Sequence, residues 1–335
     1  MMIMIRRGVF LKSIVMMAIT VVLLSAGTIK ADITGVGIEG IAYHEQGGNL
    51  SSAPNYDWWY GCSPTSAGMM MGYYDRNGYF DLVLGGTAEL STYGAGTYIA
   101  NDTIASSGHI ADFYRDNDGD GDPYGDSGDD VSPPFHSFNS LADFMGTSQD
   151  GVRAGTVAPT PDNTNGSTTF WNFTDGSQLS YTTIAGWGAN YMASSGMYGI
   201  YEYIVYAGYD VSTLYNQYIY GWGGNTLGFT LAQYQAEIDA GRPVMIHIEG
   251  HSMFGYGYVD GTTTINVYDT WNDLDGGGSW LDGQNPGTLT WGGTYGTTGW
   301  SHYGVTVLTV VPVPGAVLLG ILGMGVVGIK LRKYA

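Results

Sequence analysis

The sequence predicts an α+β fold, with helices early in the chain and β structure in its second half. Two helical patterns support this class, one directly after Cys62 and one at residues 230–241. Between them, residues 155–225 are rich in Tyr, Thr, Gly and Ser, which favours strands and long loops. No repeat of fixed period is present, which disfavours solenoids and propellers.

The two ends of the chain have the composition of export and sorting segments. Residues 1–31 join basic residues to a short apolar run, which predicts a signal peptide cleaved after Ala31, with Ala26 as the alternative. Residues 312–335 combine a Pro motif, a hydrophobic stretch and a basic end, so a sorting signal and a plain membrane anchor are the two interpretations. We therefore expect an exported domain at residues 32–311 that meets the membrane only through the terminal segments.

The expected domain is strongly acidic. Residues 32–311 contain four arginines, no lysine and all thirty acidic residues of the chain, a formal charge of −26. This charge excludes nucleic acid and anionic lipid as expected partners, and it favours binding of a divalent cation.

The second helical pattern is the clearest local signal. Thr230 is a suitable N-cap, Gln233 completes a capping box, and Gly241 is typical of a helix end. An apolar run at residues 244–248 then predicts a buried strand.

The only cysteine, Cys62, precedes the first helical pattern. We expect Ser63 to cap this helix and Pro64 to occupy its first turn, with the helix running to about Tyr74. The positive end of the helix dipole favours a thiolate, as a nucleophile requires. A buried, inert cysteine is the alternative.

A thiol nucleophile needs a base, and His251 is the best candidate. It begins an expected hairpin with a three-residue loop at 259–261, in which Tyr258 pairs with Thr262. This register sets His251 opposite Asp269, close enough for an imidazole N–H to reach the carboxylate.

Two other histidines lie in or next to expected strands. His247 alternates with apolar residues of the expected strand, so we expect it to face the other side and to be structural. His302, at the start of a later strand, is the alternative base.

The chain resembles papain-like cysteine peptidases of the bacteriocin-leader-peptidase (C-thirty-nine-like) family. The resemblance spans about residues 56–307 and is carried by the stretches YGCSPTSAGMMMGYYD, GHIADFY, SLADFMGTSQDG, NGSTTFW and AGRPVMIHIEGHSMFGYGY…VYDTW. It implies a two-lobed fold with the nucleophile at the N-terminus of a helix packed on an antiparallel sheet, and a triad of Cys62, His251 and Asp269. It also implies a peptide or protein substrate and no cofactor for catalysis.

One part of this family's pattern is missing, because the positions a few residues before Cys62 are Asn55, Tyr56 and Asp57 rather than Gln. The family has a Gln shortly before the nucleophile that donates to the oxyanion, and the candidates for this role here are Gln46 and Asn55. The C-terminal segment resembles the PEP-CTERM class of sorting signals, which implies an exosortase-type transpeptidase as a partner.

An acidic loop at residues 115–130 resembles the first half of an EF-hand. Its candidate ligands share hard carboxylate oxygens, which select calcium over transition metals: Asp116, Asp118, Asp120 and Asp122. Because Ser127 occupies the twelfth position, one of Asp126, Asp129 or Asp130 is expected to close a structural calcium site.

Three functions are compatible with these residues. The first is an exported cysteine peptidase, and the second is a catalytically weak or inactive surface or matrix protein that uses the fold for binding. The third uses the same triad for acyl transfer to a nucleophile other than water.

Overall fold

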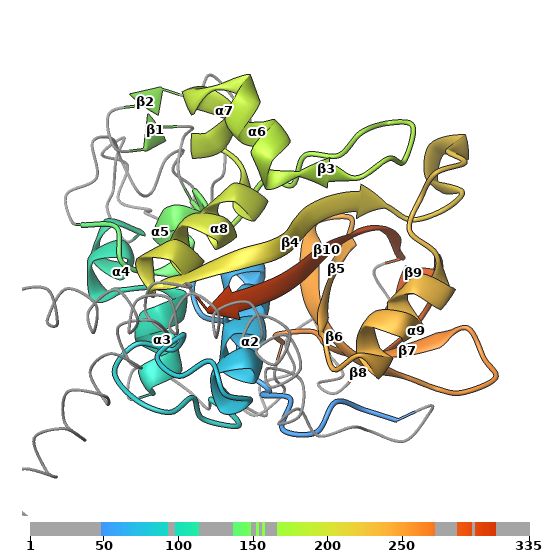
Figure 1. Cartoon of the computed structure of the whole chain (residues 1–335), viewed down its shortest axis with the longest axis horizontal. Helices are drawn as coiled ribbons and strands as arrows, with labels where there is room; N and C mark the ends of the chain where they lie inside the picture. The colour runs from blue at the N-terminus through green and yellow to red at the C-terminus, as the bar shows by residue number, and fades with distance from the viewer. Residues whose placement is uncertain are drawn as a thin grey trace, which may run out of the picture. The chain divides into compact units, whose positions relative to one another are not determined.

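An antiparallel sheet and a group of helices make up the described part of the chain (Figure 1). The structure is a computed structural model that describes residues 48–92, 98–113, 137–148, 152–153, 156–157, 166–271, 287–296 and 299–312. These residues belong to one compact unit, Tyr43–Ala335. The expected signal peptide, Gln46, the acidic loop at 115–130 and the sorting tail from residue 313 onward lie outside the described residues.

The helices precede most of the strands in the chain. They are α2 (Cys62–Arg76), α3 (Ile99–Ile104), α4 (Ser107–Phe113), α5 (Leu141–Phe144), α6 (Tyr181–Trp187), α7 (Ala189–Ala193), α8 (Gly196–Tyr206) and α9 (Leu231–Asp239), with a short 3-10 turn η1 (Trp222–Gly224). In the described residues, no helix has the length and apolar character needed to cross a bilayer.

The main sheet has the strand order β3-β4-β10-β5-β6-β7-β8, with β9 paired to β10, and every pairing is antiparallel. The strands are β3 (Leu179–Ser180), β4 (Tyr209–Tyr218), β5 (Val244–Ile248), β6 (His251–Tyr258), β7 (Thr264–Tyr268), β8 (Gly287–Thr290), β9 (Thr294–Tyr295) and β10 (Trp300–Pro312). A separate pair joins β1 (Val152–Arg153) to β2 (Thr156–Val157).

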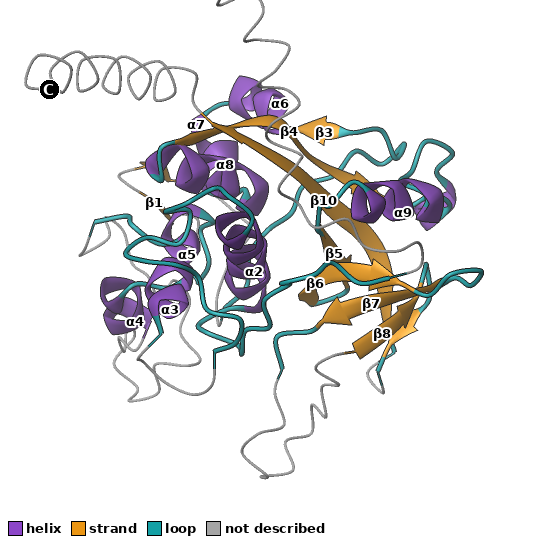
Figure 2. Ribbon diagram, turned by 60° about the horizontal axis from the view of Figure 1, so that its bottom comes forward, coloured by secondary structure: helices purple, strands orange, loops and turns teal. Residues whose placement is uncertain are grey.

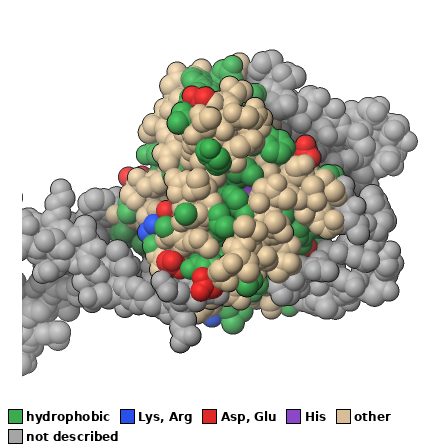
Figure 3. Space-filling model, turned by 90° about the vertical axis from the view of Figure 1, so that its right-hand side faces the viewer, with side chains coloured by type: hydrophobic (Ala, Val, Ile, Leu, Met, Phe, Trp, Pro, Cys, Tyr) green, Lys and Arg blue, Asp and Glu red, His purple; other side chains and the backbone are tan. Residues whose placement is uncertain are grey.

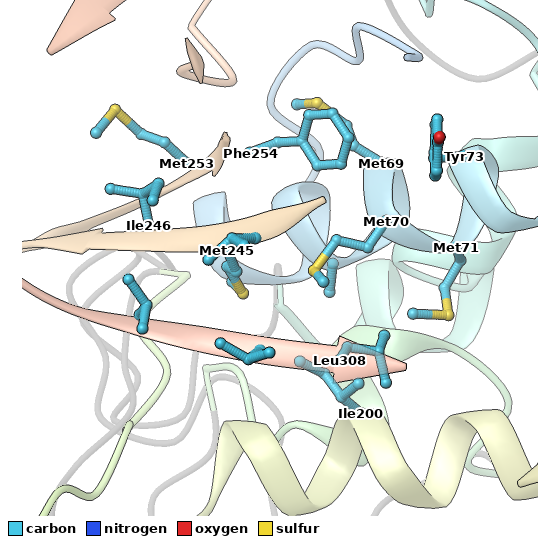
Figure 4. Close-up of a cluster of buried hydrophobic side chains, with 14 of the residues drawn as sticks. Met69, Met70, Met71, Tyr73, Ile200, Met245, Ile246, Met253, Phe254 and Leu308 are labelled. Atoms are coloured by element: carbon cyan, nitrogen blue, oxygen red, sulfur yellow. The ribbon is translucent and has the colours of Figure 1, made fainter. Parts of the chain in front are cut away.

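Helix α2 lies in the core between the helices and the sheet. Helices α2, α3, α4, α5 and α8 gather on one side of the sheet, whereas α9 lies on the other side (Figure 2). Three consecutive methionines of α2, Met69, Met70 and Met71, are fully buried. They face side chains from β5, β6, β10 and α8 (Figure 4). Burying each such side chain contributes about 1.5 to 3 kcal/mol, so α2 is held firmly in place.

The predicted α+β class is confirmed, and so are several local elements. Thr230 caps α9, and Gln233 completes the capping box. Strand β5 occupies residues 244–248 as expected, and all five of its residues are buried. Cys62 opens a helix packed on an antiparallel sheet, which is the papain-like arrangement.

The prediction of strands and loops at residues 155–225 is wrong for residues 181–206. Three helices, α6, α7 and α8, occupy this stretch, with Ser180 and Ser195 capping the first and the third of them. Met197, Ile200 and Ile204 of α8 are fully buried against the core. This tertiary burial outweighs the low helix propensity of the surrounding Gly and Tyr residues.

Candidate active site

Cys62 is the first residue of α2 and is only partly buried. The N-cap is Gly61 at φ 143°, so the expectation that Ser63 caps the helix is wrong. A Cβ at Gly61 would lie 2.7 Å from Pro64 Cγ and 2.9 Å from Thr147 Cγ2, so the turn requires glycine. The main-chain N–H of Cys62 is one of the N–H groups in the first turn that have no partner within the helix.

Two serines of α2 bind its N-terminal turn to β6. Ser63 Oγ lies 2.9 Å from Ser252 Oγ, and the Ser66 hydroxyl donates to the Ser252 carbonyl at 2.9 Å. Because His251 directly precedes Ser252, these bonds hold Cys62 beside the start of β6. Ser63 lies inside the helix, one residue after its start, so its hydroxyl pairs with Ser252 and does not act as a cap.

His251 is buried and is oriented by a main-chain group. Its Nε2 lies 2.6 Å from the carbonyl oxygen of Asp269. Because a carbonyl can only accept, the neutral ring carries its proton on Nε2, which leaves Nδ1 as a proton acceptor. The indole of Trp271 stacks on the imidazole, with ring centres 3.8 Å apart and planes 20° apart.

The expected hairpin register is wrong, and this error explains the contact of His251. Tyr258 pairs with Ile265 rather than with Thr262, and a bulge lies between Gly255 and Gly257. The longer loop moves β7 along β6, so that Trp271 rather than the Asp269 carboxylate reaches the face of His251.

The Asp269 carboxylate has other partners. One oxygen accepts from the Tyr295 hydroxyl at 2.6 Å, and the other accepts from the Trp271 N–H at 3.0 Å. The expected bond between this carboxylate and His251 is therefore replaced by the bond from the main-chain carbonyl. The carboxylate secures the turn that presents both this carbonyl and the Trp271 ring to His251.

Cys62 and His251 line one cavity of about 370 Å³. Its described walls are mostly aromatic or small and come from α2 and the segment before it, the segment at 166–170, the β5–β6 hairpin, the turn after β7, and β10: Trp58, Cys62, Ser63, Gly166, Ser167, Thr168, Phe170, Ile248, Gly250, His251, Ser252, Trp271 and Tyr303. Hydrophobic and uncharged side chains also predominate on the face shown in Figure 3. Among the described residues, no direct hydrogen bond joins Cys62 to His251. A thiol and an imidazole in one cavity are suited to nucleophilic catalysis.

Residues 163–296 match the family model described as Peptidase_C39 like family. Searches of curated proteins and of solved structures gave no match. The match supports a C39-like cysteine peptidase family. His251 and Asp269 lie within the matched segment, whereas Cys62 precedes it, so the cavity joins the matched segment to a residue from the N-terminal part of the chain.

Burial sets the protonation states of the titratable residues in this cavity. Burial raises the pKa of the Cys62 thiol, although the Ser252 main-chain N–H lowers it to a smaller extent. Burial lowers the pKa of His251 to about 4, against a smaller opposing effect of the Asp269 carbonyl. The resting pair at neutral pH is therefore a neutral thiol beside a neutral imidazole, and not the thiolate expected from the helix dipole alone.

Burial also raises the pKa of Asp269, to about 6, although the hydrogen bonds from Tyr295 and Trp271 partly oppose this effect. At neutral pH the carboxyl is mainly ionised, because its pKa still lies below 7. The ionised carboxylate is the form that accepts both of these hydrogen bonds.

The other predicted residues lie elsewhere. Asn55 pairs with Ser91 through its backbone and does not line the cavity. His302 is fully buried, accepts from the Gly292 N–H at 3.3 Å and is also absent from the described cavity walls. The described residues hold no cluster of three candidate metal ligands. The four aspartates of the predicted calcium site lie outside the described residues.

His247 pairs with Ser252 across β5 and β6, whereas His251 pairs with Ile248, so the two histidines face opposite sides as expected. The sequence did not indicate the roles of Ser252 and Trp271. A register of β6 with β7 that includes the bulge between Gly255 and Gly257 is the feature that points to Trp271.

Proposed function

We propose that this protein is an exported cysteine peptidase that hydrolyses peptide bonds through Cys62 and His251. The observation that carries the proposal is the shared cavity, in which a thiol at a helix N-terminus and an imidazole whose Nδ1 is a proton acceptor are both present. The Peptidase_C39-like match over the segment that contains His251 supports the same reaction class.

The reaction begins when substrate enters the cavity and excludes water. His251 Nδ1 takes the thiol proton as Cys62 Sγ forms a bond to the carbonyl carbon of the peptide. The carbonyl oxygen becomes an oxyanion, and the main-chain N–H of Cys62 is available to stabilise it. His251 then gives its proton to the leaving amine, the C–N bond breaks, and a thioester remains.

Hydrolysis of the thioester repeats these steps with water. His251 takes a proton from water, and the hydroxyl oxygen bonds to the acyl carbon. The C–S bond then breaks and releases the acid, and His251 returns its proton to the Cys62 sulfur, which regenerates the thiol. Asp269 is the orienting member of the proposed triad. Its carbonyl fixes the Nε2–H tautomer of His251, and its carboxylate supports the turn.

We also propose a second hydrogen-bond donor to the oxyanion, in addition to the Cys62 N–H. Gln46 is the candidate, and Asn55 is the weaker one because it does not line the cavity. One such donor contributes about 100- to 1,000-fold in rate, so the absence of both would leave a slow enzyme.

The terminal segments and the acidic loop add proposals on processing and stability. Residues 1–31 direct export, and an exosortase-type enzyme acts on residues 312–335 at the cell surface. A structural calcium ion bound by Asp116, Asp118 and Asp120 with Asp122 orders the acidic loop.

A catalytically weak binding protein on the same fold is the second candidate. It is favoured by the neutral thiol, whose pKa burial raises, and by the lack of a direct bond between Cys62 and His251 in the described residues. In this case the aromatic cavity binds a peptide without cleaving it.

Reaction of the purified protein with a peptidyl electrophile directed at thiols separates the two candidates. The peptidase predicts fast modification of Cys62 at neutral pH and at least ten-fold slower modification in His251→Ala. His302→Asn is the matched control, because it alters a buried histidine that does not line the cavity. Slow modification that is unchanged in His251→Ala would leave the binding protein as the function.

A further inference from the structure

A chain of buried polar side chains runs from Cys62 into the core. Successive members lie 2.9, 3.1, 2.7 and 2.7 Å apart and are at most 4% exposed. In order, they are Ser63, Ser252, His247, Thr306 and Asn216. They come from α2, β6, β5, β10 and β4, so this series of hydrogen-bonded side chains crosses the centre of the sheet.

The hydrogen bonds at the end of this side-chain network farthest from Cys62 have a fixed donor-to-acceptor direction. The Asn216 side-chain amide donates from Nδ2 to the Trp171 carbonyl at 3.0 Å, so its Oδ1 faces Thr306 as an acceptor. The Thr306 hydroxyl donates its only proton to this oxygen. Its own oxygen must therefore accept from His247, which places the imidazole proton on Nε2.

The same count of donors and acceptors determines the direction of the hydrogen bonds at the end nearest Cys62. With its proton on Nε2, neutral His247 offers Nδ1 as an acceptor, so the Ser252 hydroxyl donates to it. Ser252 then accepts the only proton of Ser63. Ser63 Oγ faces Cys62 Sγ at 4.0 Å with lone pairs alone. Burial lowers the pKa of His247 to about 3, which agrees with the neutral ring.

We propose that this chain, through Ser63, holds Cys62 as a neutral thiol whose S–H points at the Ser63 oxygen, so that sulfur becomes a nucleophile only when His251 removes the proton. Ser252, His247 and Thr306 are positioning residues, because they act through Ser63. Main-chain N–H groups, including that of Ser252, already favour the thiolate to a smaller extent. A further donation from the Ser63 hydroxyl would require the Ser252 and Thr306 hydroxyls to turn and His247 to change tautomer. The Thr306 hydroxyl oxygen and Asn216 Oδ1 would then be two acceptors that face each other with no proton between them.

The titratable groups around the thiol are limited within the described residues. They are His251 from β6, Tyr303 from β10 and, through the chain, His247 from β5; the described cavity walls contain no Asp, Glu, Lys or Arg. The inference rests on the proposed function in treating Cys62 as the nucleophile and His251 as its base. Its test measures thiol titration and needs no peptidase activity, so the two can fail separately.

The test is the pH dependence of iodoacetamide alkylation, followed by mass. Cys62 is the only cysteine in the chain, so the adduct reports on this thiol alone. Ser252→Ala keeps the main-chain N–H but frees the Ser63 proton to donate to sulfur. We expect the midpoint of the pH–rate profile to fall by about one unit, which corresponds to about ten-fold more thiolate at a given pH below the midpoint.

Two variants separate this effect from a general loosening of the fold. In the Ser63→Ala background, Ser252→Ala should no longer lower the midpoint, because no hydroxyl remains to donate. Thr306→Val should also lower the midpoint of the pH–rate profile. His247 is then free to carry its proton on Nδ1, which lets the side chains between it and Cys62 reverse their hydrogen bonds.

Each variant is first checked for a cooperative melting transition. An unchanged or raised midpoint in folded Ser252→Ala, or a fall that persists without the Ser63 hydroxyl, overturns the inference. If Ser252→Ala does not fold, Thr306→Val decides alone, and an unchanged midpoint overturns the inference. Lowered midpoints in a protein that cleaves no peptide would support the inference and count against the proposed function.

Discussion

Acidification from pH 7 to pH 5 should destabilise the folded protein steeply because three histidines are buried as neutral rings. Burial lowers the pKa of His251 to about 4, and the pKa values of His247 and His302 to about 3. In an unfolded chain these rings have a pKa of about 6.5. Their stabilising effect is therefore fully present above pH 6.5 and is lost as the pH falls toward their folded values.

Asp269 acts in the opposite direction. Its folded pKa, about 6, is raised above the unfolded value of about 3.8. The carboxyl therefore stabilises the fold most below pH 3.8 and loses this effect as the pH rises through 6. At pH 5 unfolding takes up about three protons at the histidines and releases about one from Asp269. The net uptake of about two protons gives a slope of about 3 kcal/mol in the free energy of unfolding per pH unit.

Urea denaturation at pH 7, 6 and 5, followed by Trp fluorescence at constant ionic strength, measures this slope. A total stability of about 5 to 15 kcal/mol is typical, so the loss is large enough to measure. His302→Asn should reduce the slope by about one proton, or about 1.4 kcal/mol per pH unit. A free energy of unfolding that is constant or rises between pH 7 and pH 5 would refute the burial of neutral histidines.

Three further outcomes test the turn and the acidic loop. Asp269→Asn keeps the carbonyl that binds His251, so kcat/KM should fall by less than about ten-fold, whereas Asp269→Ala should lower it further; a larger loss in folded Asp269→Asn would assign the orienting role to the carboxylate. Tyr295→Phe removes a hydrogen bond to a buried carboxylate and should destabilise the protein by about 2 kcal/mol at pH 8 in urea denaturation; unchanged stability would contradict the importance of this bond. Removing calcium with a chelator should lower the melting temperature, and adding back calcium but not magnesium should restore it. An unchanged melting temperature would count against the proposed calcium site.

Features determined by short segments were predictable from the sequence. The capping box of Thr230 and Gln233 needs only four consecutive residues, and the placement of Cys62 at the start of a helix needs only the pattern that follows it. The start of a strand at His251 was also predictable, because the expected hairpin begins at this residue.

Features determined by tertiary packing were not predictable. The register of β6 with β7 depends on a bulge after Gly255, and a shift of this kind changes which side chain meets His251. The helix around Ile200 is stabilised by burial against the core rather than by local propensity. The hydroxyl that pairs with Ser63 comes from Ser252, a residue 189 positions away, which no local pattern can indicate.

The central claim is that the Cys62 thiol, deprotonated by His251, cleaves peptide bonds. The most direct measurement is the appearance of new N-termini, identified by mass spectrometry, in a peptide library incubated with the purified protein. The account predicts cleavage by the natural protein and none by Cys62→Ser or His251→Ala. Equal cleavage by Cys62→Ser, or no cleavage by the natural protein at neutral pH, would contradict it.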